Sequence, residues 1–303
     1  MHFISVLDHS TETLTRLLNR AAALKARRRA GIHDRLLLGR TLGMFFDKPS
    51  TRTRVSLEVA AASMGGYAIH QEGSASRLGA REPVQDVARV MSRYTDLIAI
   101  RTFGHDVVET FARYATVPVV NALSDYSHPT QAMADMLTLR ERWGKLEGKK
   151  LVFVGDANNV ARSLAAASGR LGLSFAIARP PEYGFEAAFL ACLAKACPGM
   201  DFAETSDPAA AVGDADVLYT DVWTSMGQEA EAAERKKTFL PYQLNAALLG
   251  RAPKGCLVMH CLPAHRGQEI TDEVLESPRS VVFDQAENRM HFYRGLFAEL
   301  LEL

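Results

Sequence analysis

The sequence predicts an α/β protein of two domains, each a parallel sheet flanked by helices. Short apolar or β-branched runs recur along the chain and helical patterns separate them, which is the alternation typical of parallel sheets. A chain of 303 residues is also longer than most single compact cores. Its apolar share of 48% and charged share of 23% are those of ordinary globular proteins.

The apolar runs predict strands at residues 41–46, 97–100, 117–121, 151–154, 217–220, 257–260 and 281–283. Helices are expected between them, among them 55–64, which ends at a Gly-Gly pair, and 130–143, which ends at Gly144. A polar stretch at 143–150 precedes a fresh strand pattern, which predicts a first domain of residues 1–146 and a second of 147–303. The last helix, about residues 286–303, is long enough to cross back to the first domain.

Charge and hydropathy argue against nucleic-acid and membrane partners. The 35 basic and 35 acidic residues cancel, so no global field would attract an anionic polymer or surface. The basic cluster Lys25, Arg27, Arg28 and Arg29 is interpreted as the solvated end of a helix. No segment approaches the roughly 20 apolar residues that span a bilayer, and the amino terminus lacks a basic region followed by an apolar run. A cytoplasmic location is therefore expected.

The four cysteines, at positions 192, 197, 256 and 261, form two pairs five residues apart. That spacing directs the two side chains of a pair to different faces of a helix or of a strand. We therefore expect buried thiols rather than a structural zinc site, and neither a metal nor a cofactor.

The segment Lys48-Pro-Ser-Thr-Arg-Thr-Arg54 lies between a predicted strand and a predicted helix. A helix amino terminus offers unpaired N–H groups, and arginine adds a bidentate donor for phosphate oxygens. The alternative interpretation is an ordinary capped helix start with an Arg54 to Glu58 ion pair. The spacing is not that of a nucleotide P-loop, and the loop after Gly155 lacks the further glycines of a dinucleotide site.

Polar residues follow nearly every predicted strand, where ligands of open parallel sheets bind. They are Ser50 to Arg54, Arg101, His128 to Gln131, Asp156 to Asn159, Asp221, Cys261 and Arg289. Taken alone, His128 before a proline could be only a turn residue. The repeated placement at strand ends is nevertheless not random, and it predicts that a ligand binds where these loops converge.

The pairing of Ser50-Thr-Arg-Thr-Arg54 with His128-Pro-Thr-Gln131 some 75 residues later resembles the aspartate/ornithine carbamoyltransferase family. The resemblance extends through Arg101-Thr-Phe-Gly, Asp221-Val-Trp-Thr-Ser-Met-Gly227, His260-Cys-Leu-Pro263 and Ala286-Glu-Asn-Arg-Met290. Within the family, the Ser-Met-Gly and His-Cys-Leu-Pro elements look like those of enzymes that use ornithine. The resemblance implies transfer of a carbamoyl group from carbamoyl phosphate to the δ-amine of ornithine.

The resemblance also implies residue roles at a site between the domains. Carbamoyl phosphate would be bound by Ser50, Thr51, Arg52, Thr53, Arg77, Arg101, His128, Pro129, Thr130, Gln131, Cys261, Leu262 and Arg289. Ornithine would be bound by Asn159, Asp221, Ser225 and Met226. Arg101 and His128 would face the carbonyl oxygen, and Asp221 and Cys261 would orient the amine. A nucleophilic role for Cys261 is disfavoured, because His260 is expected on the opposite strand face.

Two further segments have implied roles. The charged run 227–237 is usually just a solvated helix, but in the family it looks like a mobile segment that closes over ornithine. The loop with Ser76 and Arg77 would reach a neighbouring subunit's site in a homotrimer, although many relatives have glutamine in place of Arg77. Rival hypotheses are a carbamoyltransferase for acetylornithine, putrescine or aspartate, a non-catalytic anion-binding relative, and an oxidoreductase using the Gly155 loop.

Overall fold

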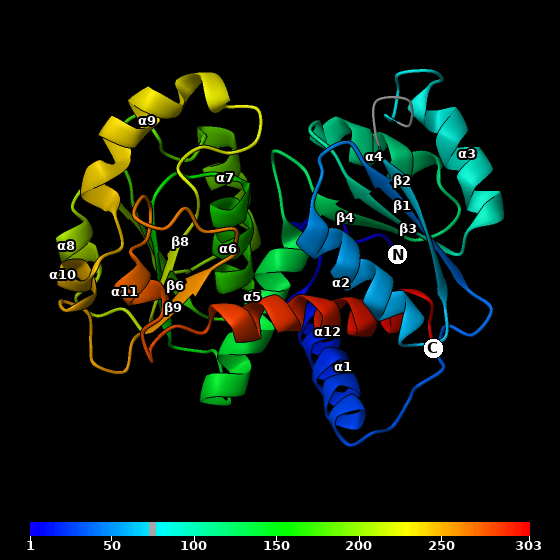
Figure 1. The fold of residues 1–303 in the computed structure, drawn as a ribbon, viewed down its shortest axis with the longest axis horizontal. Helices are drawn as coiled ribbons and strands as arrows, with labels where there is room; N and C mark the ends of the chain where they lie inside the picture. The colour runs from blue at the N-terminus through cyan, green and yellow to red at the C-terminus, as the bar shows by residue number, and fades with distance from the viewer. Residues whose placement is uncertain (73–76) are drawn as a thin grey trace. The chain divides into compact units, whose positions relative to one another are not determined.

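The computed structural model describes residues 1–72 and 77–303, and it divides into two compact units. Unit 1 comprises Met1–Leu137 and Glu287–Leu303, and unit 2 comprises Thr138–Ala286. Each unit contains one parallel sheet with helices around it, which confirms the predicted fold class (Figure 1). Helices α5 (Pro129–Trp143) and α12 (Val282–Leu300) each contribute residues to both units.

Unit 1 has a four-stranded sheet in the order β2-β1-β3-β4. Its elements are η1 (Val6–Asp8), α1 (Thr11–Arg29), β1 (Thr41–Phe46), α2 (Thr51–Ala62), β2 (Tyr67–Glu72), α3 (Val84–Tyr94), β3 (Leu97–Arg101), α4 (His105–Tyr114) and β4 (Val119–Leu123), with parts of α5 and α12. The chain passes from β1 to β2 on one side and then to β3 on the other. Parallel sheets bind ligands where strand order reverses in this way, at the carboxyl ends of β1 and β3.

The core of unit 1 forms where α3 and α4 cover the sheet. Phe45, Ile98 and Ile100 from the strands pack with Val108 and Phe111 from α4, and all five side chains are buried. These strands are apolar on both faces because helices cover both, as is usual for parallel sheets. The resulting rigid sheet holds the loops that follow β1 and β3 in fixed positions.

The carboxyl half of α12 packs on α1 within unit 1, as predicted for the last helix (Figure 1). Gly295 permits this close approach, since an added Cβ would lie 2.6–2.8 Å from atoms of Ala21. Lys25 was interpreted as part of a solvated basic cluster, which is wrong. Its side chain is buried, and Nζ donates to Asn288 Oδ1 at 2.7 Å, because the last turns of α1 are covered by α12.

His291 in α12 makes the stability of the protein depend on pH. Burial lowers the pKa of its imidazole from 6.5 to about 4, and the neutral ring donates from Nε2 to Glu287 Oε1 at 3.0 Å. Between these pKa values the unfolded chain binds a proton that the folded protein does not. The free energy of unfolding therefore falls as pH is lowered from 6.5 towards 4. We expect His291 to account for a loss of about 2 kcal/mol between pH 7 and pH 5.

Urea unfolding at the two pH values tests this expectation. The loss of stability on acidification should be about 2 kcal/mol smaller in His291→Gln than in the wild type. His33→Gln is the matched control, because His33 is exposed in the same unit. Equal acid sensitivity of the wild type and His291→Gln would show that folding does not change the pKa of His291.

Unit 2 has a five-stranded sheet in the order β7-β6-β5-β8-β9. Its elements are β5 (Lys150–Val154), α6 (Asn159–Arg170), β6 (Ser174–Ala178), α7 (Ala187–Ala196), β7 (Phe202–Thr205), α8 (Pro208–Ala211), β8 (Val217–Thr220), η3 (Glu229–Glu231), α9 (Ala232–Phe239), η4 (Leu240–Tyr242), α10 (Ala246–Leu249), β9 (Leu257–His260) and α11 (Asp272–Leu275). Strand order reverses between β5 and β8. The loops after these two strands, with Asp156 and Asp221, therefore begin beside each other.

Alternate residues of the unit 2 strands face different helices. Val152, Leu218 and Val258 lie in one apolar cluster with residues of α8, α10 and α11. On β5 and β8, Phe153 and Tyr219 stack with ring centroids 5.6 Å apart. Both faces of the sheet are thus covered, which leaves its carboxyl edge as the place where polar groups gather.

The strands β2, β6 and β7 were not predicted, and one predicted strand is wrong. Residues 281–283 were expected to be a strand, but α12 begins at Val282. Only the preceding segment pairs with β9, through Val281 N–H to the carbonyl of Val258 at 3.0 Å. Burial of Val282 in the unit 2 core overrides the β preference of the Val-Val-Phe sequence.

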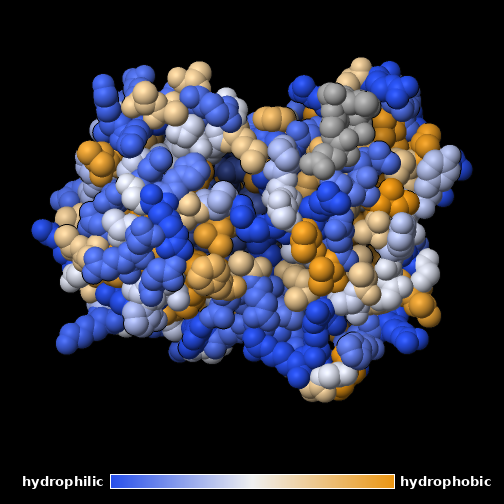
Figure 2. Space-filling model, in the orientation of Figure 1, coloured by the Kyte–Doolittle hydropathy of each residue, from blue (hydrophilic) through white to orange (hydrophobic). Residues whose placement is uncertain are grey.

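The cysteines are all free, but they are less uniformly buried than expected. Cys197 and Cys256 are buried, Cys261 is half-buried and Cys192 is exposed. Burial raises the pKa of the Cys256 thiol to about 11, which leaves it protonated and unreactive at neutral pH. Figure 2 shows hydrophobic residues scattered among hydrophilic ones over the face in view. Among the described residues no helix is both long and apolar enough to cross a membrane.

Candidate active site

The amino end of α2 forms an anion-binding corner in unit 1. Ser50 caps the helix, and its hydroxyl oxygen accepts from the N–H of Thr53 at 3.3 Å. Thr51 is exposed and Arg52 half-buried beside this cap. Arg54 lies on the outer surface and pairs with Glu58 at 3.0 Å, so the alternative of a salt-bridged helix start describes Arg54 alone. The positive amino end of the helix, with the hydroxyl and guanidinium groups beside it, suits a phosphate.

Two buried guanidinium groups meet at the hydroxyl of Thr53. Arg101, at the end of β3, donates from Nη1 to Thr53 Oγ1 at 3.5 Å and from Nε to the carbonyl of Lys48 at 3.2 Å. Arg289, from α12, donates from Nη2 to the same oxygen at 2.6 Å. Its Nε is buried with no hydrogen-bond partner among the described residues. Two like charges held this close favour an anion between them.

His128 lies close to both arginines at the start of α5. Its side chain is buried, and burial together with the charges of Arg289 and Arg101 lowers its pKa well below 6.5. The imidazole is therefore neutral at physiological pH. A neutral ring can donate one N–H to a carbonyl oxygen without adding a third positive charge to the pocket.

A direct consequence is that His128 should not titrate near neutrality. In protein labelled with ¹³C-histidine, the imidazole resonance of His128, assigned by its loss in His128→Gln, should stay unchanged between pH 8 and pH 6. The expected cause is the low pKa imposed by burial and by the two guanidinium groups. A titration midpoint near 6.5 would contradict this electrostatic environment.

Gln131, in the first turn of α5, presents an acceptor rather than a donor. Its Nε2 donates to Asp135 Oδ1 at 2.8 Å, and a carboxylate can only accept, which fixes the orientation of the amide. Its Oε1 is buried with no hydrogen-bond partner among the described residues. Together His128 and Gln131 offer one donor and one acceptor, which matches the C=O and NH₂ groups of a planar carbamoyl group.

The polar edge of unit 2 centres on Asp221, directly after β8. Asp221 Oδ2 accepts from Asn158 Nδ2 at 2.9 Å, and Oδ1 accepts from its neighbour's N–H in Val222 at 2.8 Å. The Cys261 thiol, directly after β9, donates to the same Oδ1 at 2.9 Å. The adjacent strand ends β5, β8 and β9 thus deliver an amide, a carboxylate and a thiol to one place. This arrangement suits a positively charged or amine-bearing group.

Sequence models of one family match both units. The carbamoyl-P binding domain of aspartate/ornithine carbamoyltransferase matches residues 1–141, and the Asp/Orn binding domain matches residues 147–300. The chain belongs to the aspartate/ornithine carbamoyltransferase family. An ornithine carbamoyltransferase of Pyrococcus abyssi is 49% identical over 97% of this chain and 93% of its own length. The anabolic ornithine carbamoyltransferase of Pyrococcus furiosus is 49% identical over 96% of this chain and 93% of its length.

The solved structure of the Pyrococcus furiosus ornithine carbamoyltransferase has the same fold. It superposes with a TM-score of 0.95 at 47% identity, over 98% of this chain and 96% of that one. The protein is therefore a carbamoyltransferase that contains both of the family's matched domains.

His260 of this carbamoyltransferase is closer to Cys261 than the strand pattern predicted. Potential ligand atoms of Asp221, His260 and Cys261 all lie within 4.8 Å of one another, which corrects the expectation that His260 points away. The chain turns sharply at Leu262, where φ is 58°, and this folds the segment back on the strand end. The same three groups are the described residues that could most readily hold a metal ion.

Both ring nitrogens of His260 are nevertheless occupied. Nδ1 accepts from the N–H of Leu262 at 2.8 Å, and Nε2 lies 3.0 Å from Oε1 of the fully buried Glu269. The first bond places the ring proton on Nε2, so no lone pair is left for a metal or for a proton from Cys261. The thiol directs its own proton at Asp221, which also argues against a nucleophilic cysteine.

Asn158, which was not predicted as a site residue, makes a side-chain contact with Asp221. Asn158 is the N-cap of α6, and its Oδ1 accepts from the N–H groups of Val160 and Ala161 while its Nδ2 reaches Asp221. Asn159 is half-buried in the first turn of the helix. The sequence contained a signal for this, since an asparagine before a helical run is a common N-cap.

Each of the other predicted residues lies within one of the two units. Pro129 opens α5, and the Thr130 hydroxyl lies 3.1 Å from that of Tyr293. Ser225 is half-buried and Met226 is 46% exposed in the segment after β8. Arg77 is exposed, and its neighbour Ser76 lies outside the described residues.

Lys48 is a pocket residue whose role was not predicted. Its ammonium group is buried, pairs with Asp125 and lies 4.3 Å from the centroid of the Phe103 ring. The ion pair ties the loop before α2 to the loop before His128. A lysine just ahead of a capped helix gave a weak signal, because its charge alone suggested a surface position.

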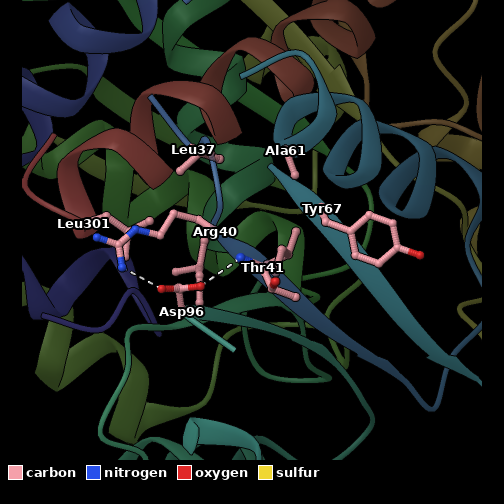
Figure 3. Close-up of a pocket in the computed structure, with 9 residues that line it drawn as sticks. Leu37, Arg40, Thr41, Ala61, Tyr67, Asp96 and Leu301 are labelled. Carbon is pink, nitrogen blue, oxygen red and sulfur yellow. Dashed lines mark hydrogen bonds and ion pairs between the residues drawn. The ribbon is translucent and has the colours of Figure 1, made fainter. Parts of the chain in front are cut away.

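A small pocket elsewhere in unit 1 does not compete as an active site. It is lined by Leu37, Arg40, Thr41, Leu42, Ala61, Tyr67, Asp96, Leu97 and Leu301. Thr41, Tyr67 and Leu97 begin their strands, so the pocket lies at the amino edge of the sheet, away from Arg101. Asp96 is satisfied by Arg40 Nη1 at 2.7 Å and by the N–H of Thr41 at 2.8 Å (Figure 3). The two charged side chains of this pocket, Arg40 and Asp96, therefore pair with each other.

Proposed function

We propose that this carbamoyltransferase is an ornithine carbamoyltransferase, which converts carbamoyl phosphate and L-ornithine into L-citrulline and phosphate. The observation that carries the donor assignment is the convergence of Arg101 and Arg289 on Thr53, beside a neutral His128 and the amino end of α2. These groups match a phosphate dianion and a carbonyl oxygen, and Gln131 Oε1 supplies the acceptor for an amide N–H. The names of the relatives support the acceptor assignment.

The chemistry explains why these residue types are needed. The ornithine δ-nitrogen attacks the carbamoyl carbon with its lone pair, and negative charge develops on the carbonyl oxygen. Arg101 and His128 stabilise that oxygen as preorganised donors. The C–O bond to phosphate then breaks, and a proton from the attacking nitrogen passes to the phosphate, which leaves as hydrogen phosphate. Ser50, Thr51, Arg52, Thr53 and Arg289 hold the departing phosphate.

Asp221 and Cys261 orient the acceptor amine. Ornithine reaches the enzyme with an ammonium group, which is attracted to the Asp221 carboxylate but must lose a proton before it can attack. Asp221 also disfavours aspartate as the acceptor, since its charge would repel the carboxylates of that substrate. Asn159, Ser225 and Met226 contact the rest of ornithine, and Leu262 and Cys261 line the reacting centre.

The deciding experiment is a colorimetric assay of purified protein with carbamoyl phosphate and a panel of ornithine, acetylornithine, putrescine and aspartate. Citrulline from ornithine alone supports the proposal. Product from another amine would retain the donor assignment and reject those of Asp221, Ser225 and Met226. Absence of any product would favour a non-catalytic anion-binding relative.

The segment that follows Met226 acts as a lid in this proposal. Gly227, where φ is 96°, and the exposed residues after it connect Ser225 to α9. Closure of this segment over ornithine would exclude water from a hydrolysable donor. Protection from proteolysis when both substrates or a stable analogue pair are bound is expected, and unchanged sensitivity would count against a lid.

We also propose a homotrimer in the cytoplasm that serves arginine biosynthesis. Edge strand β2 exposes Tyr67 and Ile69, and the adjoining α2 exposes Val55 and Val59. An apolar edge of this kind is usually covered by another chain. Light scattering should give a mass three times the chain mass of 33.2 kDa, or a multiple of that trimer. The anabolic relatives support the biosynthetic role.

Arg77 should contribute to donor binding across the trimer interface. Its exposed guanidinium would meet the phosphate in a neighbouring subunit, so Arg77→Ala should raise the KM for carbamoyl phosphate several-fold and leave the KM for ornithine unchanged. Initial-rate kinetics with each substrate varied in turn measures both constants. An unaltered KM for carbamoyl phosphate would remove Arg77 from the site.

A further inference from the structure

Arg235 in α9 is a buried cation, although the charged segment around it has the composition of a solvent-exposed helix. Its neighbours Glu234 and Lys236 are exposed, whereas Arg235 is only 3% exposed. The centre of its guanidinium group lies 4.9 Å from the ring centroid of Tyr183 and 5.2 Å from that of Phe239. Burying a charge in this way requires a partner, so the contacts of Arg235 indicate what it does.

The main partner is Asp156, directly after β5. Nη2 of Arg235 forms an ion pair with Asp156 Oδ2, and Glu231 lies farther away, with its Oε2 3.6 Å from Nη1. Burial raises the pKa of Asp156, and the charge of Arg235 opposes that rise, while the negative charge of Asp221 adds to it. Arg235 thus compensates the cost of placing a second carboxylate near Asp221.

The other partner is the backbone of the acceptor segment. Nε of Arg235 donates to the carbonyl of Trp223 at 2.5 Å. Trp223 lies midway between Asp221 and Ser225, two residues from each. One planar guanidinium therefore joins three parts of unit 2: the end of β5, the segment after β8, and α9.

A chain of contacts leads from Arg235 to the acceptor carboxylate by two routes. Along the backbone, Trp223 is two residues from Asp221. Through the β5 loop, Asp156 is two residues from Asn158, whose Nδ2 donates to Asp221 Oδ2 at 2.9 Å. Loss of Arg235 would release the segment after β8 and leave Asp156 without its compensating charge, so that both routes to Asp221 would loosen together.

We propose that Arg235 is a positioning residue for the acceptor, which sets the Asp221 to Met226 segment so that ornithine meets a preformed site. This inference rests on the proposed function. It differs from a general role in folding, because it predicts a selective loss of acceptor binding while donor binding through unit 1 is kept.

The test compares Arg235→Met and Arg235→Lys with Lys236→Met, which removes a positive charge from the next, exposed residue of the same helix. In Arg235→Met we expect the KM for ornithine to rise about tenfold or more, as when a buried hydrogen-bonded charge pair loses one partner. The KM for carbamoyl phosphate should change less than about twofold. Arg235→Lys should fall between wild type and Arg235→Met, because lysine keeps the charge but not the planar fork.

A second readout does not depend on activity. The chain has two tryptophans, Trp143 and Trp223, so a Trp143→Phe background isolates the fluorescence of Trp223. Its indole is buried against Phe239, with ring centroids 6.3 Å apart. Acrylamide should quench Trp223 more strongly in Arg235→Met than in wild type or Lys236→Met, because the segment loses its anchor.

The outcomes separate the two claims. A wild type that forms no citrulline from ornithine overturns the proposed function and this inference with it. An active wild type whose Arg235→Met variant loses thermal stability alone, or shows parallel changes in both KM values, overturns the inference only. If Arg235→Met does not fold, Arg235→Lys and Asp156→Asn carry the test, and a normal KM for ornithine in both would reject the positioning role.

Discussion

Replacing Arg101 with methionine is expected to lower kcat about 100- to 1000-fold, the usual effect of removing one preorganised donor from a site where negative charge develops. Arg101 is held before substrate arrives, by the carbonyl of Lys48 and the hydroxyl of Thr53. Its burial makes each of its remaining N–H groups more effective than it would be in water. The residual activity would come from Arg289 and the amino end of α2.

Two further variants make the Arg101 result specific. Arg101→Lys should recover part of kcat, because it restores the charge without the fork. Arg54→Met removes a guanidinium group that lies only three positions beyond Thr51 but pairs with Glu58 on the outer surface. This variant should keep a kcat near the wild-type value. Equal losses in Arg54→Met and Arg101→Met would indicate a long-range charge effect instead of a local donor.

The second large effect is expected at Asp221. Asp221→Asn should lower kcat/KM for ornithine about 100-fold. The neutral side chain of asparagine would no longer attract the positively charged amine of ornithine, and its NH₂ group would face groups that are themselves hydrogen-bond donors. Asn158, Val222 and Cys261 all donate to the carboxylate, and asparagine can accept only through one oxygen. The affinity for carbamoyl phosphate should be unchanged. Steady-state kinetics with ornithine varied at saturating carbamoyl phosphate measures this loss.

Asp214→Asn is the matched control for Asp221→Asn. Asp214 lies in the loop before β8, its side chain is 71% exposed, and it pairs with Lys150 at 2.7 Å. Exposed pairs of this kind contribute little, so its kinetics should match the wild type. A fall in carbamoyl phosphate affinity in Asp221→Asn would contradict the separation of donor and acceptor roles between these residues.

Apolar composition, more than position in the sheet, decided which strands were predictable, since edge strands β4 and β9 were predicted and interior strand β6 was missed. Strands β8 and β9 are largely apolar and buried runs, and their bounds were predicted without error. Edge strands β2 and β7 carry His70, Gln71 and Glu204, which an edge tolerates but which break the apolar signal. The start of α12 at Val282 was missed for another reason. Packing of Val282 in the core of unit 2 stabilises the helix there, although the local sequence favours a strand.

Within the site, sequence reasoning found residues that belong to compact motifs and missed those that depend on tertiary contacts. Ser50, Thr53 and Arg101 come together as expected, because strand-end loops of a parallel sheet share one edge. Arg235 and Glu269 could not be found this way. Each is a charged residue in a polar stretch, and only the folded chain shows that Arg235 meets Asp156 and that Glu269 meets His260.

The backbone at Leu262 suggests a compromise between stability and activity. A leucine with φ of 58° lies in the left-handed region, which costs a residue with a side chain roughly 1 kcal/mol relative to glycine. The N–H of Leu262 is held by His260 Nδ1, so the conformation is enforced by its surroundings. A Leu262→Gly substitution would relieve this strain and raise the melting temperature. It would also make the backbone more flexible and so increase the mobility of the adjacent Cys261 thiol. Thermal robustness and an ordered reaction centre therefore make opposite demands on this one position.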